Sequence, residues 1–310
     1  MSGLPVSAIL LSVLIHTLWG GNVVAGKFGL EVFPPFLSAG IRFVFGVATI
    51  WLWCCFRGIK LWPERAEWWL HLQISFWLTL QIALMNFGFA YTSGSSAAIL
   101  ISTNPLFAAV FAHYLIGNDR LDVFRCAGML LSFTGVVLTL YFSASISVAS
   151  DSVSASTGSA SSAAFGTLGD WLCLASSAVL GYRLIISAII MKKIDSYRLA
   201  FWPVFLSVPV FFVLGGIFES VDWAGFKWTA VAGIAYQGVV VAGVGFMVSL
   251  WLMSRYRPSL MAGFNFIAPV SGVLLSVLLL GERFSAAIAV GVGLVALGMI
   301  VLTIKSPTLD

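Results

Sequence analysis

The chain has 310 residues, of which 60% are hydrophobic and 9% are charged, and its net charge is +4. With a mean hydropathy of +1.03, it has too little polar surface to cover a soluble globule, which excludes that class. Many apolar stretches are long enough to cross a hydrocarbon core of roughly 30 Å, so the sequence predicts an all-α integral membrane protein. The small positive charge gives no indication of nucleic-acid binding, and none is expected.

Apolar segments of about 20 residues, each bounded by charged or turn residues, predict transmembrane helices. Ten are expected, over residues 6–26, 36–56, 70–91, 97–117, 125–142, 168–190, 199–218, 228–251, 259–280 and 286–304. The boundary between the third and fourth helices depends on the turn-forming residues 92–96, because no Asp, Glu, Lys or Arg occurs from Trp68 to Asn118. The first segment has no basic n-region and no A-x-A site, so we expect a retained helix and not a signal peptide.

A serine- and alanine-rich stretch separates the ten helices into two groups of five. Residues 143–167 contain a single charged residue, Asp151, and this composition is typical of a flexible linker. Residues 1–142 and 168–305 then form two five-helix units. Because five is an odd number, two homologous units of this kind face opposite ways across the membrane, as inverted repeats.

A weak internal repeat supports this division. At an offset of 164 positions the chain pairs Ser95/Ser259, Ala98/Ala262, Pro105/Pro269, Leu115/Leu279 and Gly117/Gly281. Few residues are identical, but both copies place a proline twelve residues before the glycine that ends the span. We expect Pro105 and Pro269 to lie inside their helices, to weaken them there and to act in gating.

Basic residues predict the orientation of the helices. With a cytoplasmic N-terminus, the outer loops hold Lys27, Lys227 and Arg283, whereas the inner loops and tail hold Arg57, Lys60, Arg65, Arg120, Arg125, Lys192, Lys193, Arg198, Arg255, Arg257 and Lys305. Since Lys and Arg are concentrated on the cytoplasmic side of membrane proteins, both termini are predicted to be cytoplasmic. The expected location is the plasma membrane, which in bacteria is the inner membrane.

Sequence motifs for enzymatic chemistry are missing from the chain. It has no H-E-x-x-H zinc helix, no G-x-S-x-G nucleophile elbow, no G-x-G-D aspartate motif and no Walker A loop. The four cysteines have no C-x-x-C spacing, which argues against a disulfide framework or a metal site. We therefore predict no catalytic residue, no metal and no cofactor.

Four ionisable residues fall within predicted spans: His16, Arg42, His113 and Arg183. A charge in hydrocarbon costs on the order of 3 kcal/mol or more, so Arg183 is a candidate for a cavity, with snorkelling to the headgroups as the alternative. Arg42 is interpreted as structural, paired with Glu31 or a carbonyl group. His113 is expected at the interface, and for His16 helix packing is favoured over a proton relay. All acidic residues lie in loops or at helix ends, so no midplane carboxylate is available for ion coupling.

Uncharged polar side chains mark a possible solute pathway. An amide buried in an apolar span is costly without a partner, so each must face another helix or a wet cavity. Five such amides fall in the first, third, fourth, eighth and ninth predicted helices: Asn22, Asn86, Asn104, Gln237 and Asn265. For any single amide, a hydrogen bond to another helix explains its position at least as well as contact with a solute. The five together favour a solute pathway. The fifth and tenth helices carry small-residue pairs, Gly128/Ser132 and Ala287/Gly291, that suit a packing scaffold.

Deep aromatic residues accompany these amides. Trp19, Tyr182 and Trp251 lie deeper or beside the polar set. Lipid-facing packing is the common role of such residues. A cavity of aromatic rings and amides with little fixed charge would instead suit a small amphipathic or zwitterionic solute.

Several short motifs resemble those of the EamA-type transporters of the drug/metabolite transporter superfamily. They are Leu18 to Asn22, Lys27 to Gly29, Pro34-Pro35, Ala39 to Phe43, Ala268 to Gly272 and the closing Gly281-Glu282-Arg283. The resemblance implies a ten-helix fold of two inverted repeats, cytoplasmic termini and a cavity lined by helices one, three, four, six, eight and nine. Family members export amino acids and their metabolites, aromatic compounds or drugs. The first half departs from the pattern, with Gly117-Asn118-Asp119-Arg120 where a Gly-Glu-Arg end is usual.

We therefore expect a secondary transporter that exports amino acids or related small metabolites by alternating access, with the solute and the lipid bilayer as its partners. The candidate solute contacts are Trp19, Asn22, Asn86, Asn104, Tyr182, Arg183, Gln237, Trp251 and Asn265. An exporter of drugs or lipophilic cations is one alternative. A sugar-phosphate or nucleotide-sugar exchanger is another, but it would need several basic residues in the cavity, where only Arg183 is expected. A non-transporting membrane scaffold or receptor would need no wet polar cavity at all.

Overall fold

The structure, a computed structural model, describes residues 5–116, 123, 126–138, 167–191, 193–221, 223–255, 264–265, 267–282 and 285–304. These residues are almost entirely helical, and no strand occurs among them. The first half contains α1 (Val6–Leu30), α2 (Pro35–Phe56), a short 3₁₀ helix (Arg65–Glu67), α3 (Trp68–Tyr91), α4 (Gly94–Ile101), α5 (Asn104–Leu115) and a helix over Cys126–Leu138. The second half contains α7 (Leu168–Ile190), α8 (Ser196–Phe218), a 3₁₀ helix (Trp223–Gly225), α9 (Trp228–Ala235), a π-helix (Tyr236–Gly245), α10 (Phe246–Arg255), α12 (Ile267–Leu280) and α13 (Ala286–Ile304).

Seven helical segments in the described part of the chain are long and apolar enough to cross a membrane. They are Val6–Leu30, Pro35–Phe56, Arg65–Tyr91, Gly94–Leu115, Leu168–Ile190, Ser196–Phe218 and Trp228–Ser249. Three further apolar helices are shorter over their described residues: Cys126–Leu138, Ile267–Leu280 and Ile288–Val301. All ten predicted segments thus contain an apolar helix. In seven of them the described helix is long enough to cross a membrane.

Capping residues explain where several helices begin and end. The side chain of Asp195 accepts hydrogen bonds from the backbone N–H groups of Tyr197 and Arg198 at the start of α8. Thr167 and Asp170 form a reciprocal capping box at the start of α7. At the end of α12, Gly281 has a φ of 68°, a left-handed conformation that glycine adopts without steric cost. This glycine closes the span, as the sequence predicts.

The two prolines lie in the first turns of their helices, so the expectation that they lie in the helix interior is wrong. Residues 259–263, where the ninth helix was expected to begin, lie outside the described residues. The predicted helix over residues 97–117 is divided into α4 and α5, and the division comes at Ser102 and Thr103. Pro105 is the second residue of α5, and Pro269 is the third residue of α12. In the first turn of a helix the missing N–H of proline breaks no intrahelical hydrogen bond, so both prolines are compatible with the helices they begin.

A second irregularity, the π-helix over Tyr236–Gly245, was not predicted. Its wider turns bring two glycines against α2. A Cβ atom added at Gly238 would lie 2.5 Å from the carbonyl oxygen of Arg42, and one added at Gly243 would lie 2.4 Å from the Thr49 side chain. The glycines therefore allow the π-helix and α2 to approach backbone to backbone, at the level of Arg42 and Gln237.

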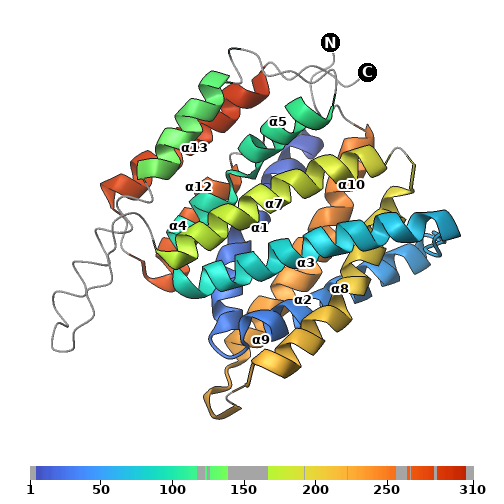
Figure 1. The fold of residues 1–310 in the computed structure, drawn as a ribbon. Helices are drawn as coiled ribbons and strands as arrows, with labels where there is room; N and C mark the ends of the chain where they lie inside the picture. Colours follow the sequence, from blue (N-terminus) through green and yellow to red (C-terminus); the bar gives the residue numbers. More distant parts are fainter. Residues whose placement is uncertain are drawn as a thin grey trace.

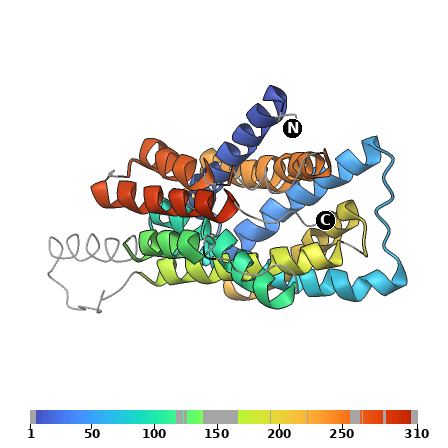
Figure 2. The same ribbon diagram turned by 90° about the horizontal axis from the view of Figure 1, so that it is seen from above.

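Helices from the two halves of the chain pack against each other throughout the bundle. α3 lies along α7, α2 along α8 and α1 along α12 (Figure 1). The core between them contains the fully buried rings of Phe43, Phe89 and Phe211. Seen from above (Figure 2), α12 and α13 occupy one side, whereas α2 and α3 extend toward the other.

The helix Cys126–Leu138 packs against α13 at the edge of the bundle, where Figure 1 shows the two in green and red. The Ser132 hydroxyl donates to the carbonyl oxygen of Val295 at 3.3 Å. A Cβ atom added at Gly135 would lie 2.7 Å from the carbonyl oxygen of Gly291, so the contact depends on small residues. The packing role predicted for the fifth and tenth helices is confirmed.

Candidate functional site

Asn22 of α1 and Gln237 of the π-helix form a hydrogen-bonded pair between the two halves of the chain. The amide nitrogen of Gln237 donates to the backbone oxygen of Asn22 at 2.9 Å and to its side-chain oxygen at 3.1 Å. Gln237 is fully buried, and its own amide oxygen has no hydrogen-bond partner in the structure. The Asn22 amide nitrogen lies 4.0 Å from the sulfur of Met85, a weak acceptor. Both residues therefore keep hydrogen-bonding capacity for a further group.

Arg183 of α7 turns into the bundle and not toward the headgroups. Its Nη2 atom donates to the amide oxygen of Gln81 at 3.3 Å, and its buried Nε has no partner. The Ser176 hydroxyl donates to the backbone oxygen of Gln81 at 2.8 Å and holds α7 against α3. This contact favours a cavity position of Arg183 over the snorkelling alternative. Its neighbour Tyr182 packs edge-on against two aromatic rings, Trp77 and Phe111, at centroid distances of 4.8 and 5.3 Å.

Arg42 of α2 is buried as well, and the sequence favoured a structural role for it, paired with Glu31 or a carbonyl group. The residue is only 6% exposed, and its Nε and Nη1 atoms have no hydrogen-bond partner. Glu31, its expected partner, forms a salt bridge with Lys227 at 2.7 Å instead. The guanidinium carbon of Arg42 lies 5.6 Å from the centroid of the Phe43 ring. Arg42 therefore does not form the ion pair with Glu31 that was considered for it.

A second cluster forms around His16. Its Nδ1 lies 2.8 Å from the backbone oxygen of Ser12, and its Nε2 lies 2.9 Å from the side-chain oxygen of Asn265. Because a carbonyl oxygen can only accept, Nδ1 carries a proton in this contact. Trp19 packs edge-on to the imidazole ring at 5.2 Å, and Trp251 packs into the same hydrophobic cluster as Trp19. The cluster thus brings together three of the predicted contacts: Trp19, Trp251 and Asn265. The Asn22–Gln237 pair is not part of this cluster.

The remaining two predicted contacts bond to backbone groups at helix boundaries. Asn86 is 1% exposed and donates to the backbone oxygen of Pro35 at 2.9 Å, which joins α3 to the start of α2. Asn104 donates to the backbone oxygen of Ile101 at 3.1 Å, across the division between α4 and α5. These partners correspond to the helix-contact alternative for a buried amide.

Gln81 and Arg42 were not among the predicted contacts. Gln81 is 3% exposed and lies in an apolar span, so the rule that selected the other amides could have selected it too. Arg42 was singled out as an ionisable residue within a span but interpreted as structural, because its environment depends on the π-helix, which lies in the other half of the chain.

A network of polar groups ties five helices together at one end of the bundle. The Lys27 ammonium of α1 donates to the backbone oxygen of Thr92, and the Thr92 hydroxyl donates to the Asp170 carboxylate of α7. Glu282, just after α12, accepts hydrogen bonds from the backbone N–H groups of Gly94 and Ser95 at the start of α4. Asp170 is fully buried. We call these residues the end network, and they hold α1, α3, α4, α7 and α12 together.

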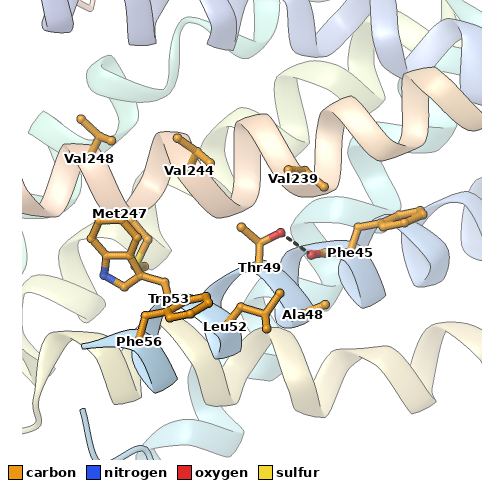
Figure 3. Close-up of a pocket in the computed structure, with 10 residues that line it drawn as sticks. All are labelled: Phe45, Ala48, Thr49, Leu52, Trp53, Phe56, Val239, Val244, Met247 and Val248. Atoms are coloured by element: carbon orange, nitrogen blue, oxygen red, sulfur yellow. Dashed lines mark hydrogen bonds between the residues drawn. The ribbon is translucent and has the colours of Figure 1, made fainter. Parts of the chain in front are cut away.

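A groove of about 500 Å³ lies between α2 and the segment formed by the π-helix and α10. Its lining consists of Phe45, Ala48, Thr49, Leu52, Trp53, Phe56, Val239, Val244, Met247 and Val248, drawn in Figure 3. The only side-chain hydroxyl among them, that of Thr49, donates to the backbone oxygen of Phe45 at 2.8 Å. The groove therefore offers few polar groups that could select a solute, chiefly the indole N–H of Trp53, so the polar residues described above are better candidates for the site.

Sequence comparisons identify the family. The model of the EamA-like transporter family matches residues 6–141 and, a second time, residues 167–304. Uncharacterized transporter YoaV of Bacillus subtilis (strain 168) is 23% identical over 293 residues, which cover 94% of this chain and 95% of that protein. A probable amino-acid metabolite efflux pump of Escherichia coli (strain K12) is 24% identical over 313 residues, which cover 93% of this chain and 92% of that protein.

The fold is also found in a solved protein. A crystal structure that is 19% identical in sequence matches with a TM-score of 0.66 and covers 97% of both chains. This likeness concerns the fold alone. The two family matches together span most of the sequence, and the apolar helices agree with them. The chain belongs to the EamA-like transporter family, and it is a multi-pass integral membrane transporter and not an enzyme.

Proposed function

We propose that this protein exports amino acids or related small metabolites across the plasma membrane by alternating access. In this proposal residues 1–142 and 168–305 are two inverted repeats of five spans each, joined by residues 143–167, and both termini are cytoplasmic. The bias of Lys and Arg toward one set of loops supports the orientation. The similarity to a probable amino-acid metabolite efflux pump of Escherichia coli supports amino acids and their metabolites as the class of solute.

The hydrogen bond between Asn22 and Gln237 is the observation that carries the proposal. It joins α1 of the first half to the π-helix of the second, in a region where Gln237 retains a buried acceptor. Transporters built from repeats bind their solute between the repeats, at helices with irregular backbone. A solute that competes for these amide groups would loosen one half from the other, which is the motion that alternating access requires.

We assign roles to the candidate residues on this basis. Asn22, Arg183 and Gln237 are proposed to contact the solute directly. Asn265, with Trp19 and Trp251, is proposed to line the path to it, and Asn86, Asn104 and Tyr182 are proposed to complete the lining. Pro105 follows the division between α4 and α5, and Pro269 lies in the first turn of α12, so we propose that gating movements occur at these two places.

Exchange in proteoliposomes tests the proposal. The purified full-length protein is reconstituted, loaded with a radiolabelled amino acid mixture and challenged with unlabelled amino acids, organic acids, phosphorylated sugars and lipophilic cations, with and without a pH gradient. Asn22→Leu should slow exchange by roughly tenfold or more, because it removes a side-chain partner of Gln237. The control is Thr49→Val in the apolar groove, which should exchange normally. A protein that exchanges no solute of the panel would contradict a transport role for this site.

One alternative gains support from the position of Arg42. A sugar-phosphate exchanger needs more than one basic residue in its interior, and Arg42 adds a second to Arg183. Export of lipophilic cations loses support for the same reason, because two interior guanidinium groups repel a cation.

A further inference from the structure

The apolar groove between α2 and the segment of the π-helix and α10 has two walls that run side by side (Figure 3). On α2 the lining residues follow one another at intervals of one, three and four from Phe45 to Phe56, so they share one face of the helix. On the other wall Val239 and Val244 are five residues apart, which is the hydrogen-bonding interval of a π-helix. The irregular backbone therefore keeps the second wall continuous along the first.

The groove opens on the outside of the bundle. Leu52, Val244 and Phe56, which line it, are 47%, 48% and 87% exposed, whereas Met247 is buried. In a multi-pass membrane protein, apolar side chains exposed on the spans face lipid. No Asp, Glu, Lys or Arg is among the lining residues. The groove is therefore suited to an apolar ligand that arrives from the bilayer.

The length of the groove matches one leaflet of a membrane. Its α2 wall extends over eleven helical steps, from Phe45 to Phe56, or roughly 17 Å at 1.5 Å per residue. The hydrocarbon core is roughly 30 Å thick, so one leaflet accounts for about half of it. Because α2 ends at Phe56, the groove reaches from the end of the helix to about the middle of the bilayer. An acyl chain of one leaflet has this depth, whereas a transmembrane helix would need the full thickness.

A positive charge lies at the end of the groove. Arg57 directly follows α2, and its guanidinium carbon lies 5.7 Å from the ring centroid of Trp53, a lining residue. The salt bridges within the described part of the chain join other side chains, so this exposed cation is available to an anion. The indole N–H of Trp53 is a further donor. Guanidinium donors match phosphate oxygens, and the bias of Lys and Arg predicts that this end faces the cytoplasmic leaflet, which is rich in anionic lipids.

We propose that the groove binds one anionic phospholipid per chain, with an acyl chain between α2 and the π-helix and the phosphate at Arg57 and Trp53. The walls belong to different matched segments, residues 6–141 and 167–304, so the bound lipid contacts both halves of the protein. This site is separate from the polar residues assigned to the solute. Lipid binding is therefore expected whichever solute the protein carries.

Native mass spectrometry of the purified full-length protein tests the inference. The delipidated protein is titrated with phosphatidylglycerol and with phosphatidylcholine of the same acyl chains, and with glycerol 3-phosphate as a probe without a chain. We expect the first phosphatidylglycerol to bind roughly tenfold or more tightly than the first phosphatidylcholine, whose choline group compensates the phosphate charge. Glycerol 3-phosphate should leave the mass unchanged, because it has no chain to fill the groove.

Matched variants locate the bound lipid. Arg57→Gln should remove the preference for phosphatidylglycerol, whereas Arg65→Gln, an exposed arginine between the same two helices, should keep it. Val244→Phe fills the groove and should weaken the binding of both lipids roughly tenfold or more. Its control is Val213→Phe, which places the same ring at an exposed position of α8 that is 59% exposed and does not line the groove. Melting temperatures near that of the wild type show that the variants are folded.

Three results would overturn the inference. The first is equal affinity of the wild-type protein for the two lipids, a comparison that needs no variant. The second is an equal loss of preference in Arg57→Gln and Arg65→Gln, which would indicate a general attraction of anionic lipid to this end of the protein. The third is a protein that retains no lipid and is a dimer that Val244→Phe dissociates, in which case the groove is an interface between two copies of the chain. Solute exchange in proteoliposomes is measured separately, so each of these results leaves the proposed transport function standing.

Discussion

The carboxylate of Glu282 accepts hydrogen bonds from the backbone N–H of Ser95, at 2.9 Å, and from the Ser95 hydroxyl, at 2.6 Å. The first N–H groups of a helix have no intrahelical partner, and the helix dipole favours a negative charge there. Glu282 therefore caps α4 from the other half of the chain. The left-handed conformation of Gly281 reverses the chain direction just before it. Gly281 and Glu282 thus have a physical role in holding α12 against α4.

Neutralising this cap should loosen the end network. We expect Glu282→Gln to lower the stability by about 1–2 kcal/mol, because a charge-assisted contact with helix N–H groups is replaced by a neutral one. The thiol of Cys173, which is fully buried on α7, should also react faster with a maleimide. The measurement is labelling of a variant whose other cysteines are replaced by serine. Unchanged melting and unchanged labelling would show that the cap contributes nothing.

Glu219 provides the matched comparison for this variant. It accepts hydrogen bonds from the backbone N–H groups of Phe36 and Leu37 at the start of α2, at 2.8 and 2.9 Å. Glu219→Gln should lower the stability by a similar amount, about 1–2 kcal/mol. It should not change the labelling of Cys173, because α2 and α8 are not part of the end network.

The pairing of Asn22 with Gln237 predicts non-additive effects on transport. Asn22→Leu and Gln237→Leu should each slow exchange by roughly tenfold or more, because each leaves a buried amide without its partner. The double variant should be little worse than either single variant, because residues in contact do not act independently. The measurement is the initial rate of exchange in proteoliposomes. Effects that simply add would indicate that the two amides act independently.

Close packing at the edge of the bundle predicts that alanine substitutions at two glycines of α13 have different effects on stability. A Cβ atom added at Gly298 would lie 2.1 Å from the Ser132 hydroxyl oxygen and 2.5 Å from the backbone oxygen of Gly128. We expect Gly298→Ala to destabilise the protein by about 1–3 kcal/mol, as overpacking does. Gly293→Ala is the control, because a Cβ atom there meets nothing within 4 Å. Equal melting temperatures for the two variants would contradict this close packing.

The prolines at the starts of α5 and α12 predict a kinetic effect. The division between α4 and α5 comes before Pro105, at Ser102 and Thr103, so Pro105→Ala should leave the fold intact. If gating movements occur at these places, Pro105→Ala and Pro269→Ala should slow exchange while the solute affinity stays the same. Binding is measured from the ligand-induced rise in melting temperature, and the rate by exchange. A Pro269→Ala protein with a normal exchange rate would count against the hinge role.

Local properties of the chain were enough to predict much of the fold. Hydropathy over about 20 residues located an apolar helix in each of the ten segments, because span length and composition are local features. Gly281 ended α12 as predicted, and the small residues near Ser132 packed as predicted. The prolines were misplaced because a break at Ser102 and Thr103 depends on hydrogen bonds with neighbouring groups, such as that of Thr103 with Ser177. A proline in the sequence does not report such contacts.

The sequence by itself determined that this protein is a multi-pass membrane transporter of two related halves, since apolar length and family motifs are written along the chain. Only the tertiary structure decided what faces the interior. Arg42 lacks the partner considered for it because Glu31 pairs with Lys227, and it lies against the π-helix of the second half, where Gly238 meets its backbone oxygen. The charge of the site is a sum over residues distant in sequence, so it becomes visible only when the helices are assembled.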